Sequence, residues 1–212
     1  MNPSALLLHG MGRTPLSMVQ LARRLRAANI DARCFGYSAT FERFATCQAR
    51  LWKRIAATKP PYVLIGHSLG TVLIRSVLPE LSVPPRACFF LTPPTVACRM
   101  ARRFAPHLLY RLLTGEMGQL LADPTFMAAL PMPSMPTTVY VGTRGWPRCF
   151  STFASLFADE ANDGILGVSE TLFSETPPNV RRVEIRAVHS FIMNHENVVR
   201  DLIDKIRVTE TL

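Results

Sequence analysis

The chain is short of lysine and of acidic side chains. Only three of its 24 basic residues are lysines, and with 15 acidic residues its formal net charge is +9. The arginines spread over several expected helices, and no basic run is interleaved with aromatic residues, so nothing indicates a nucleic-acid partner. Solvated helix faces are the simpler interpretation of this charge. Attraction to anionic substrates or to membrane surfaces stays open as the alternative.

Long hydrophobic runs and paired cysteines are also missing. No stretch reaches 18 apolar residues without a charge or a proline, so no membrane-spanning helix is predicted. No basic segment precedes the first apolar residues, which argues against a signal peptide. The five cysteines are odd in number and form no Cys-x-x-Cys motif, which favours reduced thiols in a cytoplasmic protein. The histidines lack the spacing of a metal site, and nothing requires a cofactor.

Strands and helices alternate along most of the chain. Its 212 residues, 48% of them hydrophobic, suffice for one domain over residues 1–212. The alternation predicts a three-layer α/β/α sandwich around a mostly parallel sheet of about six strands. We expect strands over 4–8, 30–37, 62–65, 86–91, 137–141 and 180–188. Four helices are expected between and after them: a first capped by Thr14, a second over 39–58, a third up to Pro79 and a closing helix capped by Asn194. The core positions expected on the second helix are Phe41, Phe44, Leu51 and Ile55.

Residues 93–136 interrupt this alternation with short apolar helical pieces, separated by Pro106, Gly115, Gly118, Pro124 and Pro131. The segment follows a strand end, so it should lie over the carboxyl edge of the sheet, where open α/β sheets bind ligands. One interpretation is a lid or pocket wall. The other is a packed helical insert with no gating role.

The stretch 62–74 joins two apolar runs through Gly66-His67-Ser68-Leu69-Gly70. A strand, a Gly-x-Ser-x-Gly turn and a helix have the form of a nucleophile elbow. The glycines remove side chains where the two elements crowd each other. The turn exposes the Ser68 hydroxyl and places the Leu69 amide at a helix N-terminus, where it can donate to an oxyanion. The five-residue match is weak alone, and its strand-to-helix context makes it specific.

An acid and a histidine follow Ser68 in the order Ser, Asp, His. Asp163 lies in an Asn-Asp-Gly turn, and His189 comes at the end of the last expected strand. Imidazole can take the serine proton near neutral pH, and a carboxylate can orient that imidazole. We therefore expect kcat/KM to rise with pH as His189 loses its proton. Asp159 and Glu160 are neighbouring alternatives to Asp163.

These pieces resemble the α/β-hydrolases, and more narrowly their small bacterial lipase- and esterase-like members. The resemblance covers nearly the whole chain and implies that Ser68 is the nucleophile, His189 the base and Asp163 the orienting acid. It also implies backbone oxyanion donors at Met11 and Leu69. The matching segments are Leu-Leu-Leu-His-Gly-Met-Gly-Arg-Thr at 6–14, Ile-Gly-His-Ser-Leu-Gly at 65–70, Asn-Asp-Gly at 162–164 and Val-His-Ser-Phe-Ile-Met at 188–193.

Other residues are expected to support this site or to lie outside it. Thr71 stands where many relatives carry a second glycine, and the stretch 146–160 contains no motif that we can interpret. Residues expected to support the loop and the elbow are His9, Gly10, Gly12, Gly66, His67 and Gly70, whereas His107 and His195 are expected to be structural or exposed.

The sequence thus predicts a serine hydrolase that cleaves carboxylic esters with an apolar acyl or alkyl part through an acyl-enzyme. A thioesterase or amidase would use the same three residues, and a non-catalytic binding module with a hydrolase fold is a third alternative. The expected partner is a small-molecule ester, and a weak interfacial contact with membrane or lipid stays open.

Overall fold

The structure, a computed structural model, describes residues 3–145, 155–157, 160–173 and 177–208. At its centre is a six-stranded sheet in the order β2-β1-β3-β4-β5-β6. Every neighbouring pair of strands is parallel, so the predicted parallel α/β fold is confirmed. The strands are β1 (Ser4–Leu8), β2 (Asp31–Phe35), β3 (Tyr62–His67), β4 (Ala87–Leu91), β5 (Thr137–Gly142) and β6 (Val180–Ile185).

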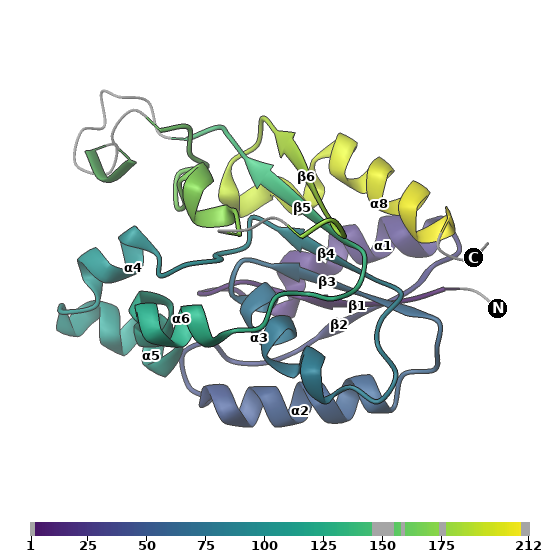
Figure 1. Cartoon of the computed structure of the whole chain (residues 1–212), viewed down its shortest axis with the longest axis horizontal. Helices are drawn as coiled ribbons and strands as arrows, with labels where there is room; N and C mark the ends of the chain where they lie inside the picture. Colours follow the sequence, from purple (N-terminus) through teal and green to yellow (C-terminus); the bar gives the residue numbers. More distant parts are fainter. Residues whose placement is uncertain (1–2, 146–154, 158–159, 174–176, 209–212) are drawn as a thin grey trace.

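Helices cover both faces of the sheet, which makes the three layers visible in Figure 1. On one face lie α1 (Val19–Ala27) and α8 (Glu196–Val208), and on the other α2 (Phe44–Ala56) and α3 (Leu69–Val77). Side chains alternate between the two faces of a strand. Leu6 and Leu8 of β1 therefore join the core beneath α2 and α3, and Ala5 and Leu7 join the core beneath α1 and α8.

Three helices between β4 and β5 lie beyond the carboxyl ends of the strands (Figure 1). They are α4 (Arg99–Phe104), α5 (Leu108–Ala122) and α6 (Pro124–Ala129). The expected break at Gly118 is wrong, because this residue lies inside α5. The break at Gly115 is present, with φ 57° and ψ −150°. A Cβ atom there would lie 2.3 Å from the Thr40 carbonyl oxygen, so the glycine allows α5 to approach the loop before α2.

Several expected element ends are wrong. The second helix begins at Phe44, and Phe41, expected in the core, is 90% exposed because it lies in the turn before that helix. The first helix starts as the 3₁₀ turn η1 (Pro15–Met18), and the Thr14 side chain makes no capping hydrogen bond. The closing helix starts at Glu196, and the Asn197 amide donates to Nδ1 of His195 at 3.3 Å, so Asn194 is not its cap. The last strand ends at Ile185, earlier than expected.

The remaining described elements are short 3₁₀ turns: η2 (Leu78–Glu80), η3 (Ser155–Phe157), η4 (Val168–Thr171) and η5 (His189–Asn194). In the described part of the chain, no helix has the length and apolar character needed to cross a bilayer. Cys34, Cys47, Cys88 and Cys98 are free thiols. Cys149 and most of the uninterpreted stretch 146–160 lie outside the described residues.

Candidate active site

Ser68 occupies the sharp turn between β3 and α3 in a backbone conformation that side chains rarely adopt. Its φ is 51° and its ψ is −120°, and such conformations raise the free energy by about 1–3 kcal/mol each unless the surroundings hold them. Here the Ser68 amide donates to the Leu91 carbonyl at 3.0 Å. The Ser68 carbonyl accepts from the amide of Thr71 at 2.9 Å and from its hydroxyl at 2.7 Å. Thr71, the residue that departs from many relatives, therefore secures the turn.

The glycines around Ser68 are required by close backbone approach. A Cβ on Gly70 would lie 2.8 Å from the carbonyl oxygens of Leu8 and His9, and one on Gly66 would lie 2.8 Å from the Thr71 amide nitrogen. Real Cβ atoms essentially never come so near, so α3 can cross β1 and β3 only where side chains are absent. At Gly10, a Cβ would lie 2.8 Å from Nδ1 of His67, so the loop after β1 rests directly against the elbow.

His189 and Asp163 are joined by side-chain and backbone hydrogen bonds. Nδ1 of His189 lies 2.7 Å from Oδ2 of Asp163, and the His189 amide donates to the Asp163 carbonyl at 2.9 Å. The other carboxylate oxygen, Oδ1, accepts from the amides of Ile165 (2.9 Å) and Leu166 (2.8 Å). Since Asp163 is 1% exposed, these partners fix its carboxylate and assign the His189 proton to Nδ1. Nε2 is then left as the acceptor nitrogen.

Ser68 and His189 line one pocket of about 230 Å³, which we call the serine pocket. Its walls are mostly apolar and come from the loop after β1, from α4 and α5, and from the loop that carries Asp163. The predicted insert thus forms one wall beside Ser68. The other lining residues are Met11, Arg13, His67, Cys98, Met100, Ala101, Tyr110, Leu121, Ile165, Leu166 and Ser190.

Two backbone amides beside the elbow, those of Leu69 and Met11, have no backbone acceptor in the part of the chain that the structure describes. The Leu69 amide belongs to the first turn of α3, where the helix offers it no acceptor. Within the described residues, the Met11 amide donates to no backbone carbonyl, and Met11 also lines the serine pocket. Among the same residues, no group of three His, Cys, Asp or Glu side chains is arranged to hold a metal ion.

His9 and His67 are buried and organise the backbone around the elbow. Burial lowers the pKa of His67 well below its usual value, and its Nε2 lies 3.0 Å from the His189 carbonyl oxygen. The His9 ring stacks on Tyr37 with centroids 4.2 Å apart, and the Tyr37 hydroxyl donates to the His9 carbonyl at 2.5 Å. Burial also lowers the pKa of His9. Its two nitrogens face carbonyl oxygens of Gly10 and Tyr37, and a neutral ring donates to only one of them.

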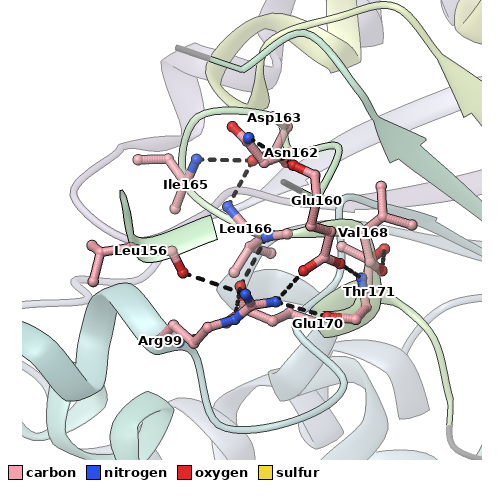
Figure 2. A network of polar contacts seen from close by, with 12 residues as sticks. Arg99, Leu156, Glu160, Asn162, Asp163, Ile165, Leu166, Val168, Glu170 and Thr171 are labelled. Carbon is pink, nitrogen blue, oxygen red and sulfur yellow. Dashed lines mark hydrogen bonds and ion pairs between the residues drawn. The ribbon is translucent and has the colours of Figure 1, made fainter. Parts of the chain in front are cut away.

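A polar network that the sequence did not reveal secures the loop of Asp163 (Figure 2). The Arg99 amide, at the start of α4, donates to Glu170 at 2.6 Å, and the Arg99 guanidinium pairs with Glu160 and Glu170. Glu170 also accepts from the Gly167 amide at 2.8 Å. An isolated bridge between Asn162 and Gly167 closes the loop around Asp163.

Two of the acids that the sequence left open, Glu160 and Asp163, have different partners. Glu160 is engaged by Arg99 and by the Ser169 amide, whereas Asp163 contacts His189. Asp159 lies outside the described residues. Burial raises the pKa of Glu170 above its usual value. The charge of Arg99 and the hydrogen bonds that Glu170 accepts from the Arg99 and Gly167 amides act in the opposite direction and lower this pKa.

Solved structures share this architecture at low sequence identity. A pyrethroid hydrolase from Sphingobium faniae superposes with a TM-score of 0.66 at 11% identity, covering 100% of both chains. The mature lipase BlEst2 from Bacillus licheniformis superposes with a TM-score of 0.73 at 13% identity, covering 97% of this chain and 92% of that one. Tomato methylketone synthase I, in complex with 2-tridecanone, superposes with a TM-score of 0.63 at 11% identity, covering 99% of both chains.

Sequence comparison adds a family assignment. No curated protein matches the chain. At these identities the structural likenesses establish the fold alone. The family model described as "Alpha/beta hydrolase family" matches residues 5–207, nearly the entire chain. With the elbow of Ser68, the parallel sheet and the matched residues all in agreement, the chain belongs to the alpha/beta hydrolase family.

Proposed function

We propose that the protein is a serine hydrolase that cleaves carboxylic esters with an apolar acyl or alkyl part. The observation that carries this proposal is the 2.7 Å hydrogen bond between His189 and Asp163, in a pocket that His189 lines together with Ser68. Ser68 is then the nucleophile, His189 the base and Asp163 the acid that holds the His189 tautomer. Membership in the hydrolase family supports the general class of reaction.

The proposed reaction proceeds in two halves. Nε2 of His189 takes the Ser68 proton as Oγ attacks the carbonyl carbon, and the resulting oxyanion accepts hydrogen bonds from the Leu69 and Met11 amides. His189 then protonates the leaving alcohol as its bond to the acyl carbon breaks. Water, deprotonated by His189, attacks the acyl-enzyme and releases the acid and Ser68. Each oxyanion donor accounts for about 10²–10³ in turnover.

The lining of the serine pocket supports an apolar group next to the scissile bond. Met100, Tyr110 and Leu121 from the insert face Ile165 and Leu166 across it. Thioesters and amides pass through the same intermediate, so they remain alternative substrates. The similar structures carry names as different as pyrethroid hydrolase, lipase and methylketone synthase. For that reason the proposal rests on the site of this chain and not on those names.

The test is the hydrolysis of p-nitrophenyl esters from acetate to octanoate by purified protein. We expect Ser68→Ala to lower kcat by about 10⁴–10⁶, as loss of a serine nucleophile does elsewhere. Ser76→Ala is the matched control, because Ser76 lies on α3 and donates to the Leu73 carbonyl at 2.8 Å, away from the serine pocket. Unchanged turnover in Ser68→Ala would overturn the proposal.

A fluorophosphonate probe separates catalysis from mere binding. The proposal predicts covalent labelling at Ser68 in folded protein, lost in Ser68→Ala and in His189→Ala. Absence of labelling in folded wild-type protein would favour a non-catalytic binding module. A panel of matched ester, thioester and amide substrates then ranks the three bond types by kcat/KM.

The surroundings of the site carry three predictions that accompany this function. We propose that the insert of residues 93–136 limits access to Ser68, because α4 and α5 line the serine pocket. We keep the prediction of a cytoplasmic protein with reduced thiols; among the described cysteines, Cys34, Cys47, Cys88 and Cys98 are free. A weak contact with lipid surfaces also stays a prediction.

A further inference from the structure

Arg13 is the one permanently charged side chain that lines the serine pocket among the described residues. It also lines a second, more open pocket of about 470 Å³, which we call the outer pocket. The outer pocket is polar, and its other lining residues are Met11, Gly12, Thr14, Ser17 and Ser190. Arg13, Met11 and Ser190 are common to both pockets, so Arg13 lies at the border between an apolar space and a polar one.

Nothing in the described part of the chain neutralises Arg13. Its neighbours at both pockets include no carboxylate, and no described acid forms an ion pair with it, in contrast to Arg24, Arg33, Arg50, Arg99 and Arg182. Asp163, the acid that contacts His189, uses both carboxylate oxygens for His189 and two backbone amides. The guanidinium carbon instead lies 5.8 Å from the centre of the Phe191 ring, which makes a cation–π contact with it.

We propose that Arg13 binds an anionic group of the substrate, so that the preferred ester carries a carboxylate or a phosphate in addition to its apolar part. The apolar part would occupy the serine pocket and the anion the outer pocket. A guanidinium matches both anions with paired N–H donors, and the hydroxyls of Thr14, Ser17 and Ser190 border the same space. This inference rests on the proposed function, because it names the substrate class of that site.

The experiment compares neutral and charged esters of equal chain length. The neutral substrate is p-nitrophenyl hexanoate, which carries no carboxylate. The mono-p-nitrophenyl ester of adipic acid carries a carboxylate on the acyl side, and the hexanoate ester of 3-carboxy-4-nitrophenol carries one on the leaving group. Hexyl phosphate, tested against 1-hexanol as inhibitor, supplies the phosphate arm. The variants are Arg13→Gln, Arg13→Lys and, as a matched loss of one exposed charge, Arg23→Gln on α1.

We expect Arg13→Gln to lower kcat/KM for at least one carboxylate ester by about 10–100-fold, the usual worth of a hydrogen bond to a charged group. For the neutral ester, kcat/KM should change by less than about threefold. Arg13→Lys should recover part of the loss, because lysine keeps the positive charge but lacks the paired N–H donors of the guanidinium. Inhibition by hexyl phosphate should weaken in parallel. Equal losses for charged and neutral esters, or the same loss in Arg23→Gln, would overturn the inference.

Failure of the proposed function would look different. In that case none of the esters is hydrolysed by wild-type protein, and the fluorophosphonate probe does not label Ser68. Calorimetric titration of hexyl phosphate into wild-type protein and Arg13→Gln then decides the role of Arg13 by binding alone. Tighter binding by wild-type protein supports the anion site, and equal affinity refutes it.

Discussion

A buried imidazole next to Ser68 makes the stability of the protein depend on pH. His67 is 1% exposed and His9 is fully buried, and burial lowers the pKa of both from 6.5 in the folded protein. In the unfolded chain they take up protons near pH 6.5, whereas in the folded chain they do so only at lower pH. Below pH 6.5 the unfolded state therefore binds more protons and gains stability relative to the folded state.

We predict that the free energy of unfolding falls as the pH drops from 6.5, by up to about 1.4 kcal/mol per pH unit for each of these two histidines. His67→Gln removes one of them while keeping an amide donor for the His189 carbonyl. Urea unfolding of both proteins between pH 7.5 and 5.0, followed by circular dichroism, measures the difference in slope. Identical slopes would show that His67 is not held neutral by burial.

At single residues, the sequence located what a motif specifies and missed what only the fold brings together. The order Ser68, Asp163, His189 predicted contact between an acid and a histidine far apart in the chain, and the structure brings Asp163 and His189 together. Their catalytic roles stay predictions. Glu170 belongs to no motif, and it meets Arg99 across 71 positions of sequence. No local pattern encodes such a meeting.

The loop from Glu160 to Glu170 and the start of α4 act as one unit. Glu170, with a side chain 3% exposed, depends on Arg99, whose side chain is 33% exposed. Removing one partner of such a pair leaves the other charge buried without compensation. The backbone of this loop supplies the amides that hold the Asp163 carboxylate. Disordering the loop would therefore also release the carboxylate that contacts His189.

We predict that Arg99→Met destabilises the protein by about 3 kcal/mol, the lower end for a broken buried pair because Arg99 is partly exposed. The loss should shrink as the pH falls toward 5, since Glu170, whose pKa burial raises, can then take up a proton. The double variant Arg99→Met with Glu170→Gln should recover much of the stability. Urea unfolding at pH 5.0 and 7.5 gives the free energies. A loss independent of pH, without recovery in the double variant, would contradict this account.

At the level of elements, the four central strands β1, β3, β4 and β5 were predictable because each is a short and mostly apolar run. The element ends were not, since they depend on tertiary contacts. Phe41 illustrates the point: its apolar side chain suggested a core position, yet α2 begins only at Phe44, where Glu116 accepts from the backbone amide at 2.9 Å. That contact comes from α5, which no pattern near residue 44 reveals.

Across the whole molecule, positive charge and an exposed apolar helix face occur together. We define the leucine face of α5 as Leu108, Leu109, Leu112 and Leu113, which are 61–69% exposed. Phe41, 90% exposed, adjoins it, because the hydroxyl of neighbouring Thr40 donates to the Leu113 carbonyl at 2.8 Å. Arg102 and Arg103 on α4 and Arg111 on α5 are exposed as well. Such a combination is typical of helices that bind anionic lipid surfaces.

We predict binding to vesicles that contain phosphatidylglycerol, weaker binding to pure phosphatidylcholine, and weakening with salt. Replacing Leu108 and Leu112 with serine should reduce the bound fraction several-fold without loss of stability, because both side chains are exposed. Val83→Ser, a change at a 50% exposed apolar residue outside this face, is the control. Co-sedimentation measures the bound fraction. Equal binding by all three proteins would remove the leucine face from consideration.

The strand order implies that local opening of the sheet can separate the residues of the candidate site before the protein unfolds. The elbow and the loop after β1 belong to strands at the centre of the sheet, whereas Asp163 and His189 belong to segments around β5 and β6, and β6 is an edge strand. Edges open more readily than centres. Ser68 and His189 therefore belong to two regions of unequal local stability. A brief detachment of β6 would separate His189 from Ser68 while most of the sheet stayed folded. Under the proposed function, turnover would then report on local opening at β6 and not only on unfolding of the whole sheet.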